Sequence, residues 1–184
     1  MTGGPCLPVA TINLPIAQES EAIVRSVYAA FSGLARSGEI ASYVAGHFHL
    51  DCEYQPVEEA SPVRGHVALI AWIERWLEAW EDAWDEIDEI VASGEVVVAA
   101  IRVHGRGRSS GLEISQRLFD VHELRDGRVL RITEYLESHQ ALGAAGLLHG
   151  HSPREWAGTD GVEMRARYCA SDVAGERRGF QART

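Results

Sequence analysis

The chain has 184 residues, of which 46% are hydrophobic, and both values are typical of one soluble globular domain with flanking segments. It carries 17 basic residues, all of them arginine, against 27 acidic residues, which gives a formal charge of −10. Because this balance repels nucleic-acid phosphates and anionic membrane surfaces, we expect neither nucleic acid nor a membrane as a partner.

The first residues and the cysteines favour a cytoplasmic protein. The opening segment MTGGPCLPVATINLPIAQ lacks a charged start, and its prolines divide the apolar residues into short runs, unlike a signal peptide or a membrane span. Cys6, Cys52 and Cys169 lie far apart and form no CxxC pair. We expect an exposed N-terminal arm over residues 1–19.

An amphipathic helix is predicted over residues 20–37, with Ser20 as its N-cap and Gly38 after its end. Its apolar residues recur at helical spacing: Ile23, Val24, Val27, Tyr28, Ala30, Phe31 and Leu34. A short helix over residues 39–46 and a strand in LDCEYQPV, residues 50–57, follow.

A long helix is predicted in GHVALIAWIERWLEAW, residues 65–80, after the loop EEASPVRG. Trp72, Trp76 and Trp80 fall at positions i, i+4 and i+8, so they lie on one face of this helix. Such a stripe is more often core than binding site, because large aromatic side chains carry much of the buried area. In a fold with a cavity, one surface can serve as both.

Four strands and a short helix complete the predicted domain. The strands are expected in DEIDEIVASG, EVVVAAIRVHG, ISQRLFDVHEL and RVLRITEYLE, and the helix begins near Ser138. Short turns join these strands, which indicates an α+β fold with antiparallel neighbours. We interpret the acidic run EDAWDEIDE as a solvated strand start. Residues 149–184 contain few apolar residues, and we expect a tail with little regular structure.

This order of elements, with the phrases LRDGRVLRITEYLESHQALGAAGL and PVRGHVALIAWIE, resembles the SnoaL-like branch of the nuclear transport factor 2-like superfamily. The resemblance covers roughly residues 20–148 and implies a cone-shaped, curved antiparallel sheet, a cystatin-like α+β barrel, wrapped around N-terminal helices. It also implies a mostly apolar cavity. Members include ketosteroid isomerases, polyketide cyclases, dehydratases and epoxide hydrolases, and domains that only bind or dimerise, so fold alone does not select a chemistry.

Ionisable residues are predicted on the cavity side of two strands. Leu118, Asp120 and His122 share one face of their strand, because alternate residues of a strand point the same way. The resemblance places an Asp that precedes a Val inside the cavity, which puts Asp120 there. The same register turns four residues of the next strand inward: Leu130, Ile132, Glu134 and Leu136. Further cavity contacts are predicted for Phe31, Glu53, Gln55, Trp72 and Trp76.

A carboxyl group among aliphatic side chains has a raised pKa and can act as a base or as a hydrogen-bond donor to an oxyanion. The resemblance matches Asp120 to the protonated Asp of the ketosteroid isomerase oxyanion hole. Gln55 falls where that family has its general base, and Phe31 falls where it has its Tyr. Tyr28 lies one turn earlier on the helix.

Several roles therefore stay open. Glu53 or Glu134 could supply the base, and His122 could pair with Asp120 as in the cyclase branch. Each residue also has a structural interpretation: Asp120 could bond to a helix-end amide or to a helix side chain, His122 could lie at the rim, and Glu53 could be solvated. Glu134 could instead pair with an arginine, and the candidates are Arg102, Arg106 and Arg117.

Three functions compete at this point. The first is a cofactor-free lyase or isomerase for a hydrophobic, ring-containing or polyketide-like molecule, with Asp120 as acid and base and with His122, Glu134 or Tyr28 in support. The second is a noncatalytic domain that binds a small hydrophobic molecule. The third is a dimerisation module, suggested by four outward apolar residues: Val96, Val98, Phe119 and Val121. A homodimer is expected in each case.

No metal site is expected. The histidine pairs His47 with His49, and His149 with His151, have no carboxylate or cysteine at ligand spacing.

Overall fold

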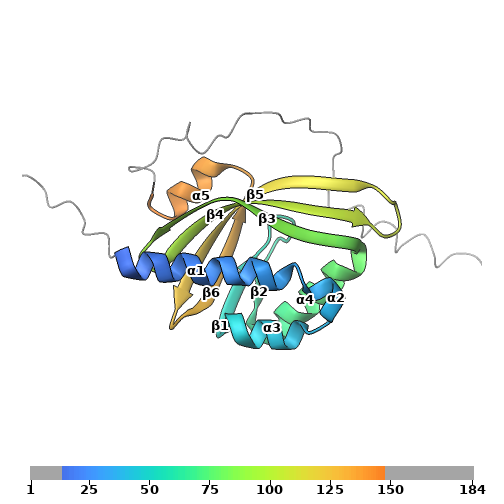
Figure 1. Ribbon diagram of the computed structural model, residues 1–184, viewed down its shortest axis with the longest axis horizontal. Coiled ribbons are helices and arrows are strands. Elements are labelled where there is room, and N and C mark those ends of the chain that lie inside the picture. The colour runs from blue at the N-terminus through green and yellow to red at the C-terminus, as the bar shows by residue number, and fades with distance from the viewer. Residues whose placement is uncertain (1–13, 148–184) are drawn as a thin grey trace, which may run out of the picture.

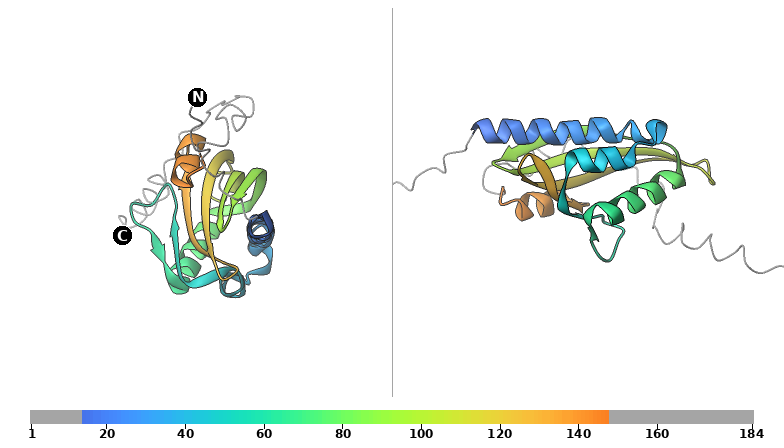
Figure 2. Two further views of the ribbon diagram at one scale, coloured as in Figure 1. Left: turned by 90° about the vertical axis from the view of Figure 1, so that its left-hand side faces the viewer. Right: turned by 90° about the horizontal axis from the view of Figure 1, so that it is seen from below.

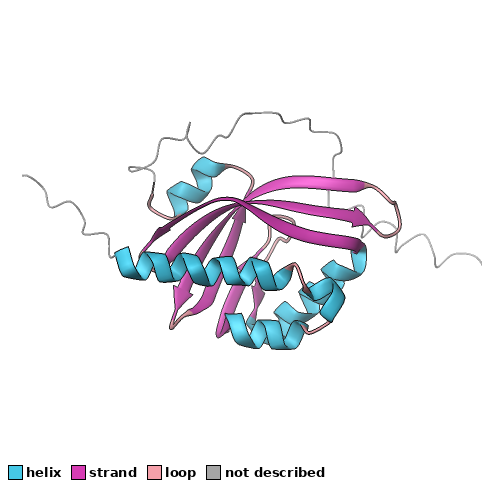
Figure 3. Cartoon of the chain, in the orientation of Figure 1, coloured by secondary structure: helices cyan, strands magenta, loops and turns pink. Residues whose placement is uncertain are grey.

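The computed structural model describes residues 14–147, which form a curved, open sheet with helices on both faces (Figure 1). The elements in chain order are α1 (Leu14–Phe31), α2 (Leu34–Ser37), α3 (Ile40–His47), β1 (Phe48–Gln55), β2 (Val63–Arg64), α4 (Gly65–Ala79), β3 (Trp80–Ser93), β4 (Val96–Gly107), β5 (Glu113–Arg125), β6 (Arg128–Tyr135) and α5 (Ser138–Ala144). The predicted α+β class is confirmed, although the sheet does not close into a barrel (Figure 3).

Helix α1 begins at Leu14, well before the predicted start at Ser20. Pro15 lies in its first turn, where the missing N–H of proline breaks no helical hydrogen bond. Ala17 and Ser20 are both buried on the side of this helix that faces the protein. Residues 14–19 therefore belong to the helix and not to an arm. The rest of the expected arm and the whole expected tail at 149–184 lie outside the described residues.

The strand order is β2-β1-β6-β5-β4-β3. Strands β3 to β6 form an antiparallel meander, as their short turns predict. Strand β1 pairs in parallel with β6, so the expectation of a purely antiparallel sheet is wrong at this pair. The two strands are far apart in the sequence, and the chain between them supplies the long crossover that a parallel pair requires.

Irregular pairing bends the sheet around α1. The register shifts between Trp80 and Asp82 and between Ile87 and Glu89 where β3 pairs with β4, and between Glu123 and Leu124 where β5 pairs with β6. Such bulges increase the local twist and bend the strand. Helix α1 lies against one face of the bent sheet and α5 against the other (Figure 2).

The main core lies between α1, α3, α4 and the inner face of the sheet. Trp80, which follows α4, packs against Gly105 of β4. A Cβ atom at Gly105 would lie 2.9 Å from the Trp80 ring, so this close approach requires glycine.

A second apolar cluster lies on the outer face under α5. Val98, Phe119 and Val121 of the sheet pack with Ala141 and Leu142 of α5, and all five are buried within one chain. Three of the four residues that suggested a sheet-to-sheet contact are therefore already covered. Dimer formation stays a prediction, and these three side chains no longer support it.

No helix within residues 14–147 is long and apolar enough to span a membrane.

Candidate active site

A cavity of about 690 Å³ lies between the inner face of the sheet and helices α1, α3 and α4. Its wall is largely apolar, as is usual for pockets that take small organic ligands. The aromatic residues of this wall are Tyr28, Phe31, Tyr43, Phe48, Tyr54, Trp72, Trp76 and Trp80.

Tyr28 joins two ionisable side chains of β5 at the cavity wall. Its hydroxyl donates to Asp120 Oδ2 at 2.6 Å and lies 2.9 Å from His122 Nε2. Asp120 and His122 are 3% and 0% exposed and lie on one face of β5. The helix residue and the two strand residues thus form a buried cluster, which we call the Tyr28 cluster.

Burial controls the charge of this cluster. Loss of solvation raises the pKa of Asp120 to about 7, although the hydrogen bond from Tyr28 acts in the opposite direction. Burial also lowers the pKa of His122 to about 3, so its ring is neutral at neutral pH. Asp120 can therefore change its charge near neutral pH, and His122 provides no counter-charge.

The cluster can accommodate both protonation states of Asp120. When Asp120 is a carboxylate, Tyr28 donates to it, and the tautomer of His122 with a proton on Nε2 donates to the Tyr28 oxygen. When Asp120 is protonated, it donates to the Tyr28 oxygen, and Tyr28 donates to a bare Nε2 of His122. Titration of Asp120 thus exchanges the His122 tautomer without breaking the chain of hydrogen bonds.

Two buried atoms of this cluster have no hydrogen-bond partner in the described structure, Asp120 Oδ1 and His122 Nδ1. Buried polar atoms are rarely left unpaired in folded proteins. Asp120 also lines the cavity, so its Oδ1 atom is a hydrogen-bonding group without a partner beside the cavity.

Glu134 forms a second carboxyl site with a different arrangement. The Tyr54 hydroxyl donates to its Oε1 atom, and the Val57 backbone N–H donates to its Oε2 atom at 3.1 Å. Burial, followed by the charge of Asp120, raises the pKa of Glu134 well above its usual range. Both oxygens are engaged, so Glu134 connects the wall to the loop of residues 56–62 between β1 and β2, which we call the rim loop. Glu134 offers no free atom comparable to Asp120 Oδ1.

Asp85 of β3 also lines the cavity, and the sequence interpretation missed it. It lies in the acidic run that was expected to be solvated. The structure shows its inward side through the alternation of β3, where Trp84 and Glu86 on either side are exposed. Burial raises the pKa of Asp85 to about 7, and its Oδ1 atom is buried without a partner.

The structure brings most of the predicted site residues to this cavity. Its wall includes nine of them: Tyr28, Phe31, Trp72, Trp76, Leu118, Asp120, His122, Ile132 and Glu134. Their catalytic and binding roles stay predictions. Four further predicted residues, Glu53, Gln55, Leu130 and Leu136, lie outside the wall.

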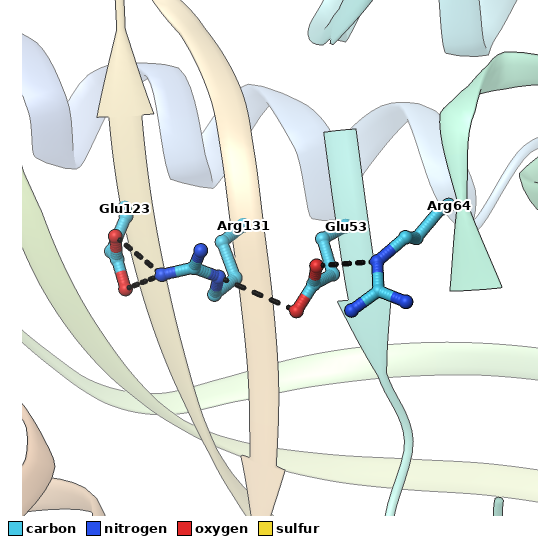
Figure 4. Close-up of polar contacts among 4 residues, drawn as sticks. All are labelled: Glu53, Arg64, Glu123 and Arg131. Atoms are coloured by element: carbon cyan, nitrogen blue, oxygen red, sulfur yellow. Dashed lines mark hydrogen bonds and ion pairs between the residues drawn. The ribbon is translucent and has the colours of Figure 1, made fainter. Parts of the chain in front are cut away.

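Glu53 and Gln55 lie on the wrong side of β1 for a cavity role. Cys52 and Tyr54 face the core, so their alternate neighbours point away from it. Glu53 lies 2.9 Å from Arg64 and 3.6 Å from Arg131 on the outer face (Figure 4). Gln55 donates to the backbone oxygens of the rim loop that follows it. The count from the family pattern missed Tyr54, the cavity residue between them.

Leu130 is displaced by the irregular end of the β5–β6 pair, and Leu136 lies beyond the other end of β6. The register shift lets Val129, which is 0% exposed, take the inward place, and Leu130 is half-buried outside the cavity wall. Leu136 follows the last residue of β6 and is 56% exposed. The alternation that correctly places Ile132 and Glu134 therefore fails at both ends.

No group of three or more His, Cys, Asp or Glu side chains within residues 14–147 is arranged to hold a metal ion.

Solved structures described as nuclear transport factor 2-like or as having a ketosteroid isomerase-like fold have a similar fold. A protein from Jannaschia sp. CCS1, described as a SnoaL-like polyketide cyclase, is 17% identical with a TM-score of 0.59, over 73% of this chain and 95% of that one. An epoxide hydrolase from M. tuberculosis is 21% identical with a TM-score of 0.54, over 73% and 92%. A ketosteroid isomerase-like protein from Catenulispora acidiphila, solved with trimethylamine, is 17% identical with a TM-score of 0.55, over 71% and 97%. At these identities the likeness shows the fold alone.

The SnoaL-like domain model matches residues 24–132, which is more than half of the chain. The protein therefore belongs to the SnoaL-like family, as the sequence motifs indicate. A search of curated proteins gave no match.

Proposed function

We propose that the protein is a cofactor-independent cyclase, isomerase or dehydratase that moves a proton on a small ring-containing or polyketide-like molecule. One observation carries this proposal: in a largely apolar cavity, the buried carboxyl group of Asp120 has one oxygen fixed by Tyr28 and the other without a partner. A bound carbonyl compound would present its acidic C–H or its oxygen to Asp120 Oδ1.

Asp120 suits acid and base catalysis better than Glu134 does. A catalytic group works best when its pKa lies near the working pH, and the pKa of Asp120 is raised to about 7. Glu134 has a pKa raised well above its usual range and uses both oxygens in hydrogen bonds. We therefore assign Asp120 the proton transfer and Glu134 the positioning of Tyr54.

Tyr28 and His122 support the same step. Tyr28 fixes the orientation of the Asp120 carboxyl group, and His122 gives or takes the hydrogen bond of Tyr28 as Asp120 changes charge. Neither needs a net charge of its own. The neighbours described as a polyketide cyclase and an epoxide hydrolase support a catalytic use of this fold.

Hydrogen exchange tests the proposal without knowledge of the natural substrate. Cyclic ketones and β-keto esters are incubated in D₂O with native protein, and loss of the proton next to the carbonyl group is followed by NMR. We expect exchange above the buffer rate, and a fall of about 10²- to 10⁴-fold in Asp120→Asn, which is the usual contribution of a general acid or base.

Glu123→Gln is the matched control, since it makes the same chemical change on the outer face of the same strand. Exchange that persists in Asp120→Asn, or that never exceeds the buffer rate for any compound bound in the cavity, contradicts the proposal.

The second candidate is a noncatalytic domain that binds a small hydrophobic molecule. It is favoured by Gln55, which occupies the position expected for the general base. Gln55 has no carboxyl group and lies outside the cavity wall. A co-purified compound recovered unchanged after long incubation with the protein supports this candidate, and its conversion excludes it.

A homodimer in the cytoplasm is the setting we propose for either function. Sedimentation of the native protein at micromolar concentration tests the oligomeric state, and a monomer throughout would contradict the dimer.

A further inference from the structure

The wall of the cavity contains more carboxyl groups than basic side chains. Among the described residues, five acidic side chains line it, from Glu58, Glu59, Asp85, Asp120 and Glu134. Arg75 is the one arginine in the wall; it is 51% exposed, and its Nη2 atom lies 2.9 Å from Glu59 at the rim. His122 is neutral because burial lowers its pKa to about 3. The interior therefore lacks a positive charge of its own.

Aromatic rings gather in one corner of the cavity. The Phe31 ring lies 6.1 Å from Tyr43 and 5.7 Å from Trp76, and Trp76 lies 5.7 Å from Trp80, measured between ring centres. We call these four residues the aromatic corner. Indole and phenol rings attract cations to their faces, most strongly where water is excluded.

Asp85 borders the aromatic corner. Its backbone N–H lies 3.4 Å from the hydroxyl of Ser32, the residue after Phe31. Tyr43 and Asp85 line the same cavity, and the pKa of Tyr43 is raised first by burial and then by the negative charge of Asp85. The Oδ1 atom of Asp85 is buried, and no described residue bonds to it.

We propose that the natural ligand of this cavity is an amine cation, with its nitrogen against Asp85 inside the aromatic corner. The inference rests on the proposed function, because it names the ligand class of that same cavity. A positive nitrogen would supply the partner that Asp85 lacks and would meet the faces of Phe31, Trp76 and Trp80. The apolar remainder of the ligand would extend along the wall to Asp120.

Affinity for such a cation should depend on pH. The titratable groups that face Asp85 are Tyr28 of α1, Tyr43 of α3 and Asp120 of β5. Burial raises the pKa of both phenols, so they stay neutral, whereas the pKa values of Asp85 and Asp120 are both about 7. A bound cation favours the ionised carboxylate and releases a proton, so binding strengthens as the pH rises through about 7.

Two probes of equal shape isolate the charge. Phenyltrimethylammonium carries a permanent positive charge, and tert-butylbenzene is its neutral carbon counterpart. Both are titrated into native protein by tryptophan fluorescence, with ligand NMR as a check. At about pH 8 we expect phenyltrimethylammonium to bind roughly tenfold or more tightly than tert-butylbenzene does. We expect this ratio of affinities to fall by about tenfold toward pH 6. Equal affinities, or tighter binding of tert-butylbenzene at about pH 8, would overturn the proposal.

Asp85→Asn locates the effect. We expect this variant to lose the preference for the cation and to keep its affinity for tert-butylbenzene. Glu86→Gln is the control, since Glu86 is the next residue of β3 and its side chain is 63% exposed. An unchanged preference in Asp85→Asn would place the cation elsewhere and overturn the assignment. If Asp85→Asn does not fold, the ratio of the two probe affinities in native protein, and the pH dependence of this ratio, still test the proposal.

The outcome is separable from that of the proposed function. If native protein shows no preference for the cation but still catalyses hydrogen exchange that depends on Asp120, only the proposed ligand class is wrong. A cation preference without any exchange leaves a binding domain for amines.

Discussion

Both faces of the sheet carry acidic side chains, but the surroundings of these side chains differ between the faces. On the outer face, Arg131 lies between Glu123, at 2.9 Å, and Glu53, at 3.6 Å, and Arg64 continues this row onto β2 (Figure 4). On the inner face, by contrast, Asp120 has no arginine partner in the described structure.

The contrast recurs further along the sheet. Asp88, at the register shift of β3, lies 2.9 Å from Arg102 and 3.3 Å from Arg117 on the outer face. Asp85, three positions earlier on the inner face, has a buried oxygen without a partner. Exposed ion pairs add little stability, and unpaired buried acids reduce it, so the inner acids are retained at a cost that a binding or catalytic role would explain.

The largest effect is expected from the apolar middle of the outer face. Leu142→Ala removes a side chain that is 0% exposed and that covers Val98 and Val121. We expect a loss of about 2–5 kcal/mol in the free energy of unfolding, because the change leaves a cavity. Urea denaturation measures it, and Leu136→Ala, at a 56% exposed position, is the control. Equal losses in both variants would show that α5 does not stabilise this face.

Removal of the Tyr28 hydroxyl should weaken catalysis at the inner face. The hydrogen bond from Tyr28 lowers the pKa of Asp120, so in Tyr28→Phe this pKa should rise, and the rising limb of a pH–rate profile should move to higher pH. We expect activity to fall by about 10- to 100-fold at neutral pH, since a hydrogen bond to a charged group contributes about 1.5–3 kcal/mol. Tyr135→Phe, in the outer cluster, is the control. If the midpoint of the pH–rate profile is the same in Tyr28→Phe as in native protein, the hydrogen bond from Tyr28 does not control the pKa of Asp120.

Acid sensitivity separates Asp120 from His122. The pKa of Asp120 is raised from 3.8 to about 7, so its contribution to stability is full at low pH and is lost as the pH rises through that window. The pKa of His122 is lowered from 6.5 to about 3, so its contribution is lost as the pH falls. In native protein the two oppose each other.

Asp120→Asn removes one of these opposing effects. The variant should lose more stability on acidification from about pH 8 to about pH 4.5 than native protein does, by an amount on the order of 1–3 kcal/mol. Thermal and urea unfolding at several pH values measure the difference. Parallel stability curves for the two proteins would show that Asp120 is not buried as described.

The smallest effect is expected at the arginine row of the outer face. Glu53→Gln removes one partner of Arg64 and Arg131, whose side chains are 68% and 42% exposed. We expect a loss below about 1 kcal/mol, because solvent screens such pairs, and no change in activity or ligand affinity. A substantial loss of activity would show that Glu53 acts at the site after all, as one sequence interpretation suggested.

Regular alternation made much of the inner face predictable. Leu118, Asp120 and His122 follow strict i, i+2 spacing on β5, and the structure places all three on the cavity wall. Ile132 and Glu134 follow from the same rule on β6. The prediction worked where the strand pairing is regular.

The failures have local causes. A register shift, which no residue pattern marks, exchanges Leu130 for Val129 on the inner side of β6. Asp85 was missed because the charges around it suggested a solvated segment, and because the structure turns Ala83 and Asp85 inward and leaves Trp84 46% exposed. The contact between Tyr28 and Asp120 joins residues 92 positions apart, and only the packing of α1 on the sheet determines it.

Glu134 joins the cavity wall and the rim loop through a single carboxyl group. Its two oxygens bind the Tyr54 hydroxyl in the wall and the Val57 N–H in the rim loop. One carboxyl group is thus shared by the wall and the loop, so the position of Tyr54 and the position of the Val57 backbone depend on the same side chain.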